Sequence, residues 1–114
     1  MKKLLTIFSL VLLSSCSQET EVVTGPFVFK NDITYDQNTN EPITGIVEEY
    51  YENGQLKEEK NYKDGERDGL REIYHENGQL KSKANYKDGE LDGLVEHYYE
   101  NGQLRGKINL KDGE

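Results

Sequence analysis

The aspartates that lie beside glycines are the first side chains whose spacing suggests chemistry, because clustered carboxylates can bind Ca²⁺. They are Asp64, Asp68, Asp88 and Asp92. The alternating Asp-x-Asp-x-Asp pattern of a calcium loop is missing around them. Asp-Gly pairs are typical of tight turns, in which both residues tolerate a positive φ. Turn formation therefore explains these aspartates, and the sequence predicts no metal site.

The two histidines, His75 and His97, could bind zinc or transfer protons. They occupy non-equivalent positions, and the only cysteine is Cys16, far from both. The sequence contains no Gly-x-Ser-x-Gly, no phosphate-binding loop and no nucleophile beside a base. We therefore expect no catalytic residues and no cofactor, and a protein that is not an enzyme.

The N-terminal segment has the pattern of a secretion signal. Two lysines precede an apolar run over residues 4–13. A transmembrane helix needs about 20 apolar residues, so this run is of signal-peptide length. The Leu-Ser-Ser-Cys sequence that follows, over residues 13–16, closely resembles the bacterial lipobox. The alternative is an ordinary secretory signal followed by a chance cysteine.

A lipobox implies that residues 1–15 are a lipoprotein signal peptide and that Cys16 receives acyl chains such as palmitate. Each buried methylene of such a chain contributes ~0.8 kcal/mol to membrane binding. Ser17 rather than an aspartate follows the cysteine, which in enterobacterial lipoproteins favours sorting to the outer membrane. We expect a lipid-anchored protein of the bacterial cell envelope, at the outer membrane rather than the inner one.

The composition indicates one small, acidic domain with little apolar material for a deep core. Of the 114 residues, 32% are charged and 33% hydrophobic, with three Phe, no Trp and eight Tyr. The net charge of −8 argues against nucleic acid, which requires basic surfaces. It suits a basic partner or simply solubility.

A repeat with a period of 24 residues dominates the rest of the chain. The hexapeptide Glu-Asn-Gly-Gln-Leu-Lys, with Arg as its last residue in the third copy, occupies residues 52–57, 76–81 and 100–105. Tyr-Lys-Asp-Gly-Glu recurs at the same interval over residues 62–66 and 86–90. Such self-similarity is typical of repeat architectures, in which each unit packs on its neighbours.

Each unit reads as a β-hairpin. The first strands are expected at residues 45–51, 69–75 and 93–99, and the return strands at 56–62, 80–86 and 104–110. An Asn-Gly pair separates the two, and we expect it to form a two-residue type I′ turn. Residues 27–35 add one more strand, and residues 16–26 form the lipidated cysteine and a flexible tether. The sequence therefore predicts an all-β, elongated antiparallel meander of about seven strands over residues 27–114.

The repeated unit resembles the bacterial variant of the MORN repeat over about residues 33–114. The resemblance rests on Gly-x-x-x-x-Tyr-Tyr-x-Asn-Gly-Gln-Leu-Lys followed by Tyr-Lys-Asp-Gly-x-x-Asp-Gly. Proteins with this repeat are often labelled YwqK-like toxin–antitoxin antitoxins. The resemblance implies an elongated sheet and a binding role, and it supplies no catalytic residues.

A two-residue turn at Asn-Gly would place Tyr51 opposite Leu56 and divide the side chains between two faces. The better buried face would carry Val47, Tyr51, Leu56, Tyr62, Ile73, Leu80, Ala84, Tyr86, Val95, Tyr99, Leu104, Ile108 and Leu110. A three-residue turn with a bulge would swap the two faces.

The other face would carry a ladder of tyrosines beside a ladder of glutamates, with successive members ~10 Å apart. Its candidate binding residues are Tyr50, Tyr74, Tyr98, Glu48, Glu72 and Glu96. It could hold a basic protein segment, and we therefore expect a protein-interaction module at the envelope. An antitoxin or immunity protein is a special case of this expectation. A carbohydrate-binding module for cell wall or exopolysaccharide and a purely structural spacer are the alternatives.

Overall fold

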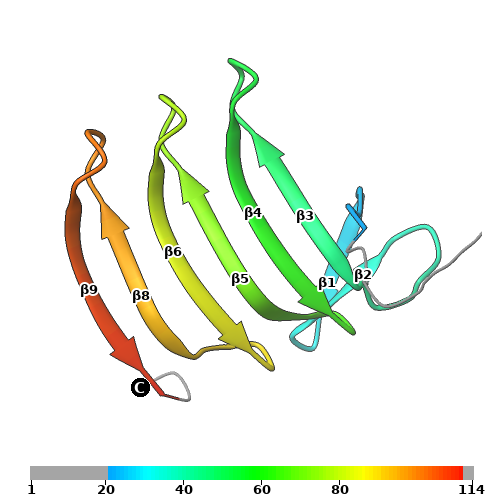
Figure 1. Cartoon of the computed structure of the whole chain (residues 1–114). Helices are drawn as coiled ribbons and strands as arrows, with labels where there is room; N and C mark the ends of the chain where they lie inside the picture. The colour runs from blue at the N-terminus through cyan, green and yellow to red at the C-terminus, as the bar shows by residue number, and fades with distance from the viewer. Residues whose placement is uncertain (1–20, 112–114) are drawn as a thin grey trace, which may run out of the picture.

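The computed structural model describes residues 21–111, which form two antiparallel β-sheets (Figure 1). Its strands are β1 (Phe27–Lys30), β2 (Ile33–Asp36), β3 (Gly45–Tyr50), β4 (Leu56–Lys63), β5 (Glu66–Tyr74), β6 (Leu80–Lys87), β7 (Glu90–Leu91), β8 (Gly93–Tyr98) and β9 (Leu104–Leu110). β1 pairs only with β2, whereas the main sheet has the order β3-β4-β5-β6-β8-β9, with the short β7 beside β6. The predicted all-β meander is confirmed.

Two of the four Asp-Gly pairs within residues 21–111 form the two-residue turns between successive hairpins. Asp64 and Gly65 have φ values of 51° and 84°, and the residues that flank them, Lys63 and Glu66, are paired. Two successive positive φ values define a type I′ turn, whose twist matches that of the strands it joins. The other pair of this kind, at residues 88–89, has the same conformation.

The Asn-Gly pairs form a different turn from the one predicted. Gly54 has a φ of 90°, but Asn53 does not have a positive φ. The Tyr51 amide donates to the Gln55 carbonyl at 2.8 Å, and the Gly54 amide donates to the Tyr51 carbonyl at 3.0 Å. These bonds close a three-residue loop in which the Asn53 side chain accepts a hydrogen bond from the Gln55 amide. The prediction of a type I′ turn at Asn-Gly was wrong.

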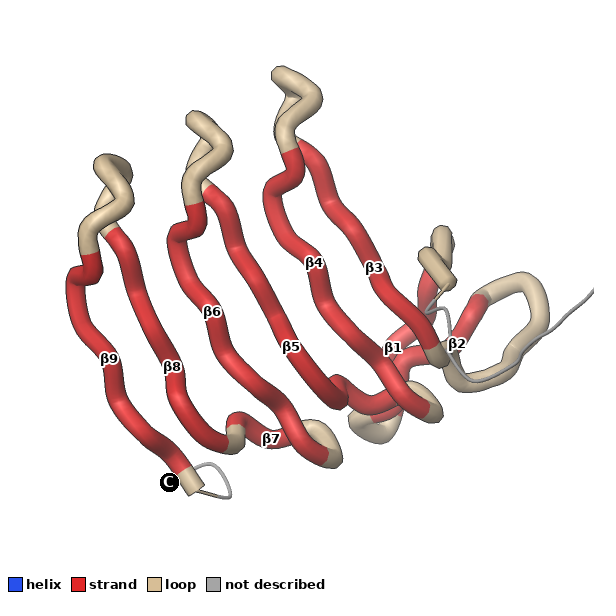
Figure 2. The backbone as a smooth tube through the Cα atoms, in the orientation of Figure 1, coloured by secondary structure: helices blue, strands red, loops and turns tan. Residues whose placement is uncertain are grey.

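The segment predicted as one strand over residues 27–35 is a hairpin. Asn31 and Asp32, between β1 and β2, have φ values of 53° and 65°. Asparagine and aspartate adopt this conformation more readily than other non-glycine residues, so the pair forms a two-residue turn. Figure 2 shows the hairpin beside one end of the main sheet. This extra turn and the separate β7 raise the number of strands above the seven predicted.

The N-terminal edge of the main sheet is covered by the chain that precedes β1. The Ile46 amide donates to the Glu21 carbonyl at 2.9 Å, and the Val23 amide donates to the Ile46 carbonyl at 2.7 Å. Val22 thereby forms a parallel bridge with Ile46. Residues 21–23 belong to the segment predicted as a flexible tether over residues 16–26, and these three residues are bound to the sheet instead.

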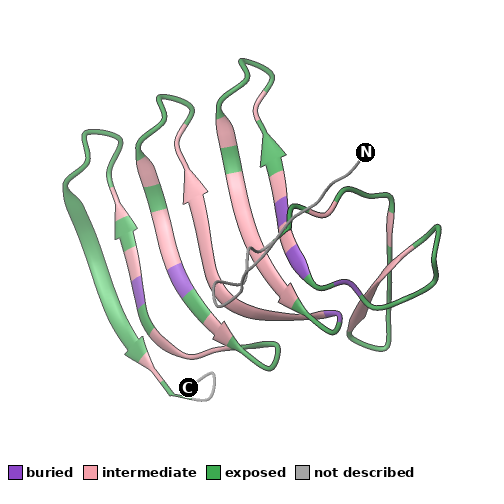
Figure 3. Ribbon diagram, turned by 45° about the vertical axis from the view of Figure 1, so that its right-hand side comes forward, coloured by how far each residue is buried: buried purple, intermediate pink, exposed green. Residues whose placement is uncertain are grey.

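The main sheet is a single layer, so few side chains are removed from water (Figure 3). Among the described residues, the buried apolar side chains are Ile43, Val47, Ala84 and Val95. The last three lie on the face predicted to be better buried, in agreement with the sequence. Stability must therefore come mainly from contacts between neighbouring strands.

The loops of the first two hairpins are hydrogen-bonded to the next hairpin along the sheet. The Tyr51 hydroxyl donates to the Tyr74 carbonyl at 2.6 Å. One repeat later, the His75 Nε2 atom lies 3.0 Å from the Tyr98 carbonyl oxygen. A phenol and an imidazole therefore make equivalent contacts. This explains why His75 is accommodated at the position that tyrosine occupies in the first and third repeats.

The loop asparagines repeat this connection. The Asn53 Nδ2 donates to the Glu76 carbonyl at 3.2 Å, and the Asn77 Nδ2 donates to the Glu100 carbonyl at 2.9 Å. Asn101 occupies the third equivalent position, and in the described chain it makes only the local bond to the Gln103 amide. The asparagines therefore hold neighbouring hairpins in register.

We expect Asn77→Ala to lower the free energy of unfolding by about 1 kcal/mol more than Asn101→Ala. Both substitutions remove the local bond inside the loop, but only Asn77 also donates to the next hairpin. A net contribution of about 1 kcal/mol is typical of one hydrogen bond. Urea unfolding of the two variants measures the difference, and equal losses would show that the inter-hairpin bond contributes nothing.

Candidate functional site

The Tyr–Glu surface comprises the six candidate binding residues of the second face. They are Glu48 and Tyr50 on β3, Glu72 and Tyr74 on β5, and Glu96 and Tyr98 on β8. Each tyrosine follows its glutamate by two residues, so the two side chains share a face of the sheet. The structure thus places all six predicted residues on one surface.

Hydrogen bonds join the tyrosines of this surface to their glutamates. The Tyr50 hydroxyl donates to Glu48 Oε1 at 2.9 Å, and the Tyr74 hydroxyl donates to Glu72 Oε1 at 3.0 Å. The first bond raises the pKa of the 57% exposed Tyr50. Burial, supported by the bond to Glu72, raises the pKa of Tyr74 to about 12. The phenols therefore stay neutral and orient the carboxylates.

The three-residue loop changes the neighbours of this surface. Tyr50 is paired with Leu56, whereas the sequence predicted Leu56 opposite Tyr51. The same register places Leu80 opposite Tyr74 and Leu104 opposite Tyr98. The three leucines that we assigned to the Val47 face therefore lie beside the tyrosines.

Glu59 is the functional candidate that the sequence reasoning missed. It lies on β4 directly between Glu48 on β3 and Glu72 on β5. Burial, followed by the charges of Glu48 and Glu72, raises the pKa of Glu59. The equivalent positions in the later repeats are Lys83 and Lys107. Comparison of the repeats at this position would have shown that only the first repeat has an acidic residue there.

None of the three carboxylates of β3, β4 and β5 belongs to the ion pairs of the described residues, although Lys83 on β6 is paired opposite Glu72. Those ion pairs join Lys60 to Glu49 and Arg71 to Glu58. Lys60 and Glu49 alternate along their strands with Glu59 and Glu48, so they face the other side of the sheet. The acidic row of Glu48, Glu59 and Glu72 is therefore a negative patch that an external cation can neutralise.

We expect Glu59→Gln to stabilise the fold by about 0.2–1 kcal/mol at pH 7, since like charges on opposite strand positions repel each other. The raised pKa means that the folded chain binds this proton more tightly than the unfolded chain does. Wild-type stability therefore falls as pH rises from the ordinary value of 4.5 through the raised folded value. The advantage of the variant should vanish below that window.

The matched control is Glu49→Gln, which removes a carboxylate paired with Lys60 at 3.2 Å. It should be neutral or slightly destabilising at pH 7. Denaturant unfolding of both variants between pH 3 and pH 8 measures the effect. A Glu59→Gln variant that is less stable than wild type at pH 7 would contradict the repulsion.

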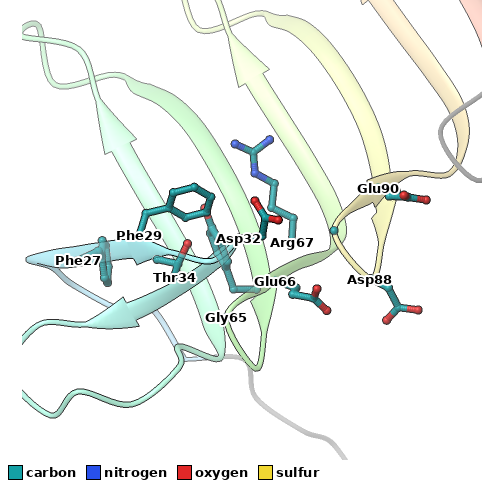
Figure 4. Close-up of a pocket in the computed structure, with 11 residues that line it drawn as sticks. Phe27, Phe29, Asp32, Thr34, Gly65, Glu66, Arg67, Asp88 and Glu90 are labelled. Carbon is teal, nitrogen blue, oxygen red and sulfur yellow. The ribbon is translucent and has the colours of Figure 1, made fainter.

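A cleft of about 700 Å³ lies between the β1–β2 hairpin and the turns that precede β5 and β7 (Figure 4). Phe27 and the 68% exposed Phe29 line it from β1. The carboxylates that line it are Asp32, Glu66, Asp88 and Glu90. The cleft can accept an apolar group that ends in a positive charge. Sequence reasoning did not find it because its walls come from turns of different repeats.

Arg67 is the cation of this cleft, and its contacts in the described structure are with tyrosines. Its guanidinium lies 5.3 Å from the centre of the Tyr86 ring, and Nη1 donates to the Tyr86 hydroxyl at 3.2 Å. Burial acts to lower the pKa of Arg67, but the hydrogen bond to Tyr62 and the proximity of Tyr86 outweigh it and raise the pKa. Arg67 therefore braces the two tyrosines against β5.

The other residues considered in the sequence either lie outside the described residues or form no metal-binding cluster within them. Cys16 and the signal-peptide residues 1–15 lie outside residues 21–111. No three His, Cys, Asp or Glu side chains of the described residues are grouped so as to hold a metal ion. No helix within those residues is long and apolar enough to cross a membrane.

Comparison with known proteins agrees with the repeat seen in the structure. The family model described as MORN repeat variant matches residues 43–64, 67–88 and 91–112. Each match covers one hairpin, and the first two end within the turn that leads to the next hairpin. No curated protein and no solved structure matches the chain. The three matches together cover more than half of the sequence, and the chain belongs to the MORN repeat variant family.

Proposed function

We propose that this chain is a bacterial lipoprotein that acts as a non-catalytic protein-interaction module at the cell envelope. Acyl chains on Cys16 would hold it in the membrane, in keeping with the lipobox pattern of residues 13–16. MORN repeats generally mediate protein or membrane interactions, which supports the module. The outer membrane is the favoured location because Ser17 follows the cysteine.

The covered edge of β3 supports a defined orientation on the membrane. Glu21 is bonded to β3 and lies five residues after Cys16. Five residues span at most about 18 Å when fully extended. A lipid on Cys16 would therefore keep the β3 edge close to the bilayer, with β9 at the opposite end of the sheet. The sheet faces would remain accessible to another protein.

The observation that carries the proposal is the acidic row of Glu48, Glu59 and Glu72. Like charges on directly opposite strand positions destabilise a sheet, and lysine is accepted at the same position in both later repeats. A selected role for Glu59 in binding accounts for this arrangement. The chemistry that fits is a Lys- or Arg-containing protein segment, whose apolar stems would lie against Tyr50 and Tyr74.

The test is cross-linked capture of envelope proteins by the anchored chain. Glu59→Lys copies the residue of the other repeats, so it reverses the charge while leaving the fold intact. It should reduce capture of a basic partner by at least ten-fold. Lys83→Glu extends the acidic row and should preserve or increase capture. Binding at this surface would be contradicted if capture stayed unchanged both in Glu59→Lys and in the alanine triple variant of Tyr50, Tyr74 and Tyr98.

An antitoxin or immunity role is a narrower form of the same proposal, suggested by the resemblance to YwqK-like proteins. It requires that deletion of the gene harms growth only when a neighbouring toxin is present. The carbohydrate alternative requires a sugar to bind the tyrosine ladder. A glycan array probed with the chain separates the two, because a protein-interaction module should bind no sugar.

A further inference from the structure

The β9 strand is the open edge of the main sheet within the described residues. It pairs with β8 on one side and has no strand on the other. Leu104 and Ile108 are 47% and 57% exposed, and Tyr99 in the preceding loop is 51% exposed. An unpaired strand of this kind can accept an extended segment of another chain.

The pairing between inner hairpins shows which side chains lie opposite the strand that is equivalent to β9. β6 is the equivalent of β9 one repeat earlier, and its outer neighbour is β8. In that pairing Lys83 lies opposite Glu96, and Ser82 lies opposite His97. Lys107 occupies the position of Lys83 one repeat later. A strand added to β9 in the same register therefore places one residue opposite Lys107, and an acidic residue fits there.

The loop of the last hairpin holds the donors that join earlier hairpins to their neighbours. Tyr51 and Asn53 donate to carbonyl groups of the following hairpin. The equivalent groups are Tyr99 and Asn101, which make no such bond in the described chain. Their acceptors would be backbone carbonyls, so any extended segment can supply them. Its side chain opposite Lys107 then decides which segment is preferred.

The charge of β9 favours a segment of a different protein over a second copy of this chain. β9 carries Arg105 and Lys107 and no acidic residue, on a chain whose net charge is −8. Pairing of β9 with the β9 of a second copy would bring four cations together. Pairing with the β3 edge of a second copy is hindered because the Ile46 amide and carbonyl are already bonded to residues 21–23. An acidic segment of a different protein avoids both obstacles.

We propose that β9 binds an extended segment of a partner protein by antiparallel strand addition, with a Glu or Asp of the partner opposite Lys107. This surface is separate from the acidic row on β3–β5, and it carries the opposite charge. Lys107 alone could serve only to discourage aggregation at the edge. The exposed Leu104 and Ile108, together with the two free loop donors, instead match the groups that neighbouring hairpins use to bind one another.

The test uses two synthetic peptides and the full 114-residue chain. The first peptide has the sequence of residues 90–99, which already pairs beside Lys83 in the fold. The second peptide carries lysine in place of the glutamate at position 96. The first should bind, measured by fluorescence anisotropy, and should protect β9 amides from hydrogen exchange. The second should bind at least three-fold more weakly, and Lys107→Glu should reverse that preference.

Asn101→Ala supplies a control that does not depend on charge. It should weaken binding of the first peptide three- to five-fold, whereas Asn53→Ala, at the far end of the array, should leave binding unchanged. Equal affinity for both peptides, protection at any strand other than β9, or no binding would overturn the proposal. Concentration-dependent dimerisation that protects β9 would overturn the choice of an acidic partner.

Discussion

Gly65→Ala is expected to lower the free energy of unfolding by about 2–5 kcal/mol. Gly65 is in a type I′ turn with a φ of 84°, which costs an L-residue about 1–2 kcal/mol. It is also buried against the β1–β2 hairpin, where an added Cβ would clash with Ile33 Cγ2 and lie 3.0 Å from the Thr34 carbonyl oxygen. Such overpacking costs a further 1–3 kcal/mol.

Gly89→Ala is the matched control for this substitution. Gly89 occupies the same turn position one repeat later, with a φ of 88°. The nearest atom to its added Cβ is Glu66 Oε2 at 3.7 Å, an ordinary contact. This variant should lose only the backbone contribution of about 1–2 kcal/mol. Equal losses in the two variants, measured by urea unfolding, would show that the β1–β2 hairpin does not pack on the turn.

Cys16→Ser is expected to release the protein almost completely from the membrane fraction of a bacterial host. The substitution removes the thiol that would receive the acyl chains, and each buried methylene of those chains contributes ~0.8 kcal/mol. The measurement is immunoblotting of membrane and soluble fractions, together with the intact mass of the membrane-bound wild type.

Ser15→Thr is a suitable control, since it changes the residue beside the cysteine and preserves the thiol. It should slow processing at most and leave the final product in the membrane. An unmodified cysteine in the intact mass, or retention of Cys16→Ser in the membrane fraction, would contradict lipid anchoring.

The architecture was predictable because the same turn and strand patterns occur in three successive repeats. Asp-Gly and Asn-Gly pairs mark the ends of the strands at a fixed interval. The tyrosine and glutamate ladders follow from the alternation of side chains along β3, β5 and β8. The register at the Asn-Gly loops was not predictable in the same way. Asn53-Gly54 fits both a two-residue and a three-residue loop, and the bond from the Gln55 amide to the Asn53 side chain accompanies the latter.

The neighbours of the candidate site depended on that register. Glu59 enters the acidic row only when β4 is paired with β3 and β5 as observed, so the charge ladder of single strands could not reveal it. The cover over the β3 edge was also hidden. Residues 21–23 have no periodicity, and their bonds to Ile46 use backbone groups that any sequence provides.

Binding at the acidic row is tested most directly by an NMR titration of the ¹⁵N-labelled chain with a short Lys-rich peptide. We predict that chemical shifts change first at Glu48, Glu59 and Glu72, and that Glu59→Lys abolishes these changes while Glu49→Gln preserves them. Shift changes confined to the Val47 face, or a response that persists unchanged in Glu59→Lys, would contradict the assignment of the acidic row as the binding surface.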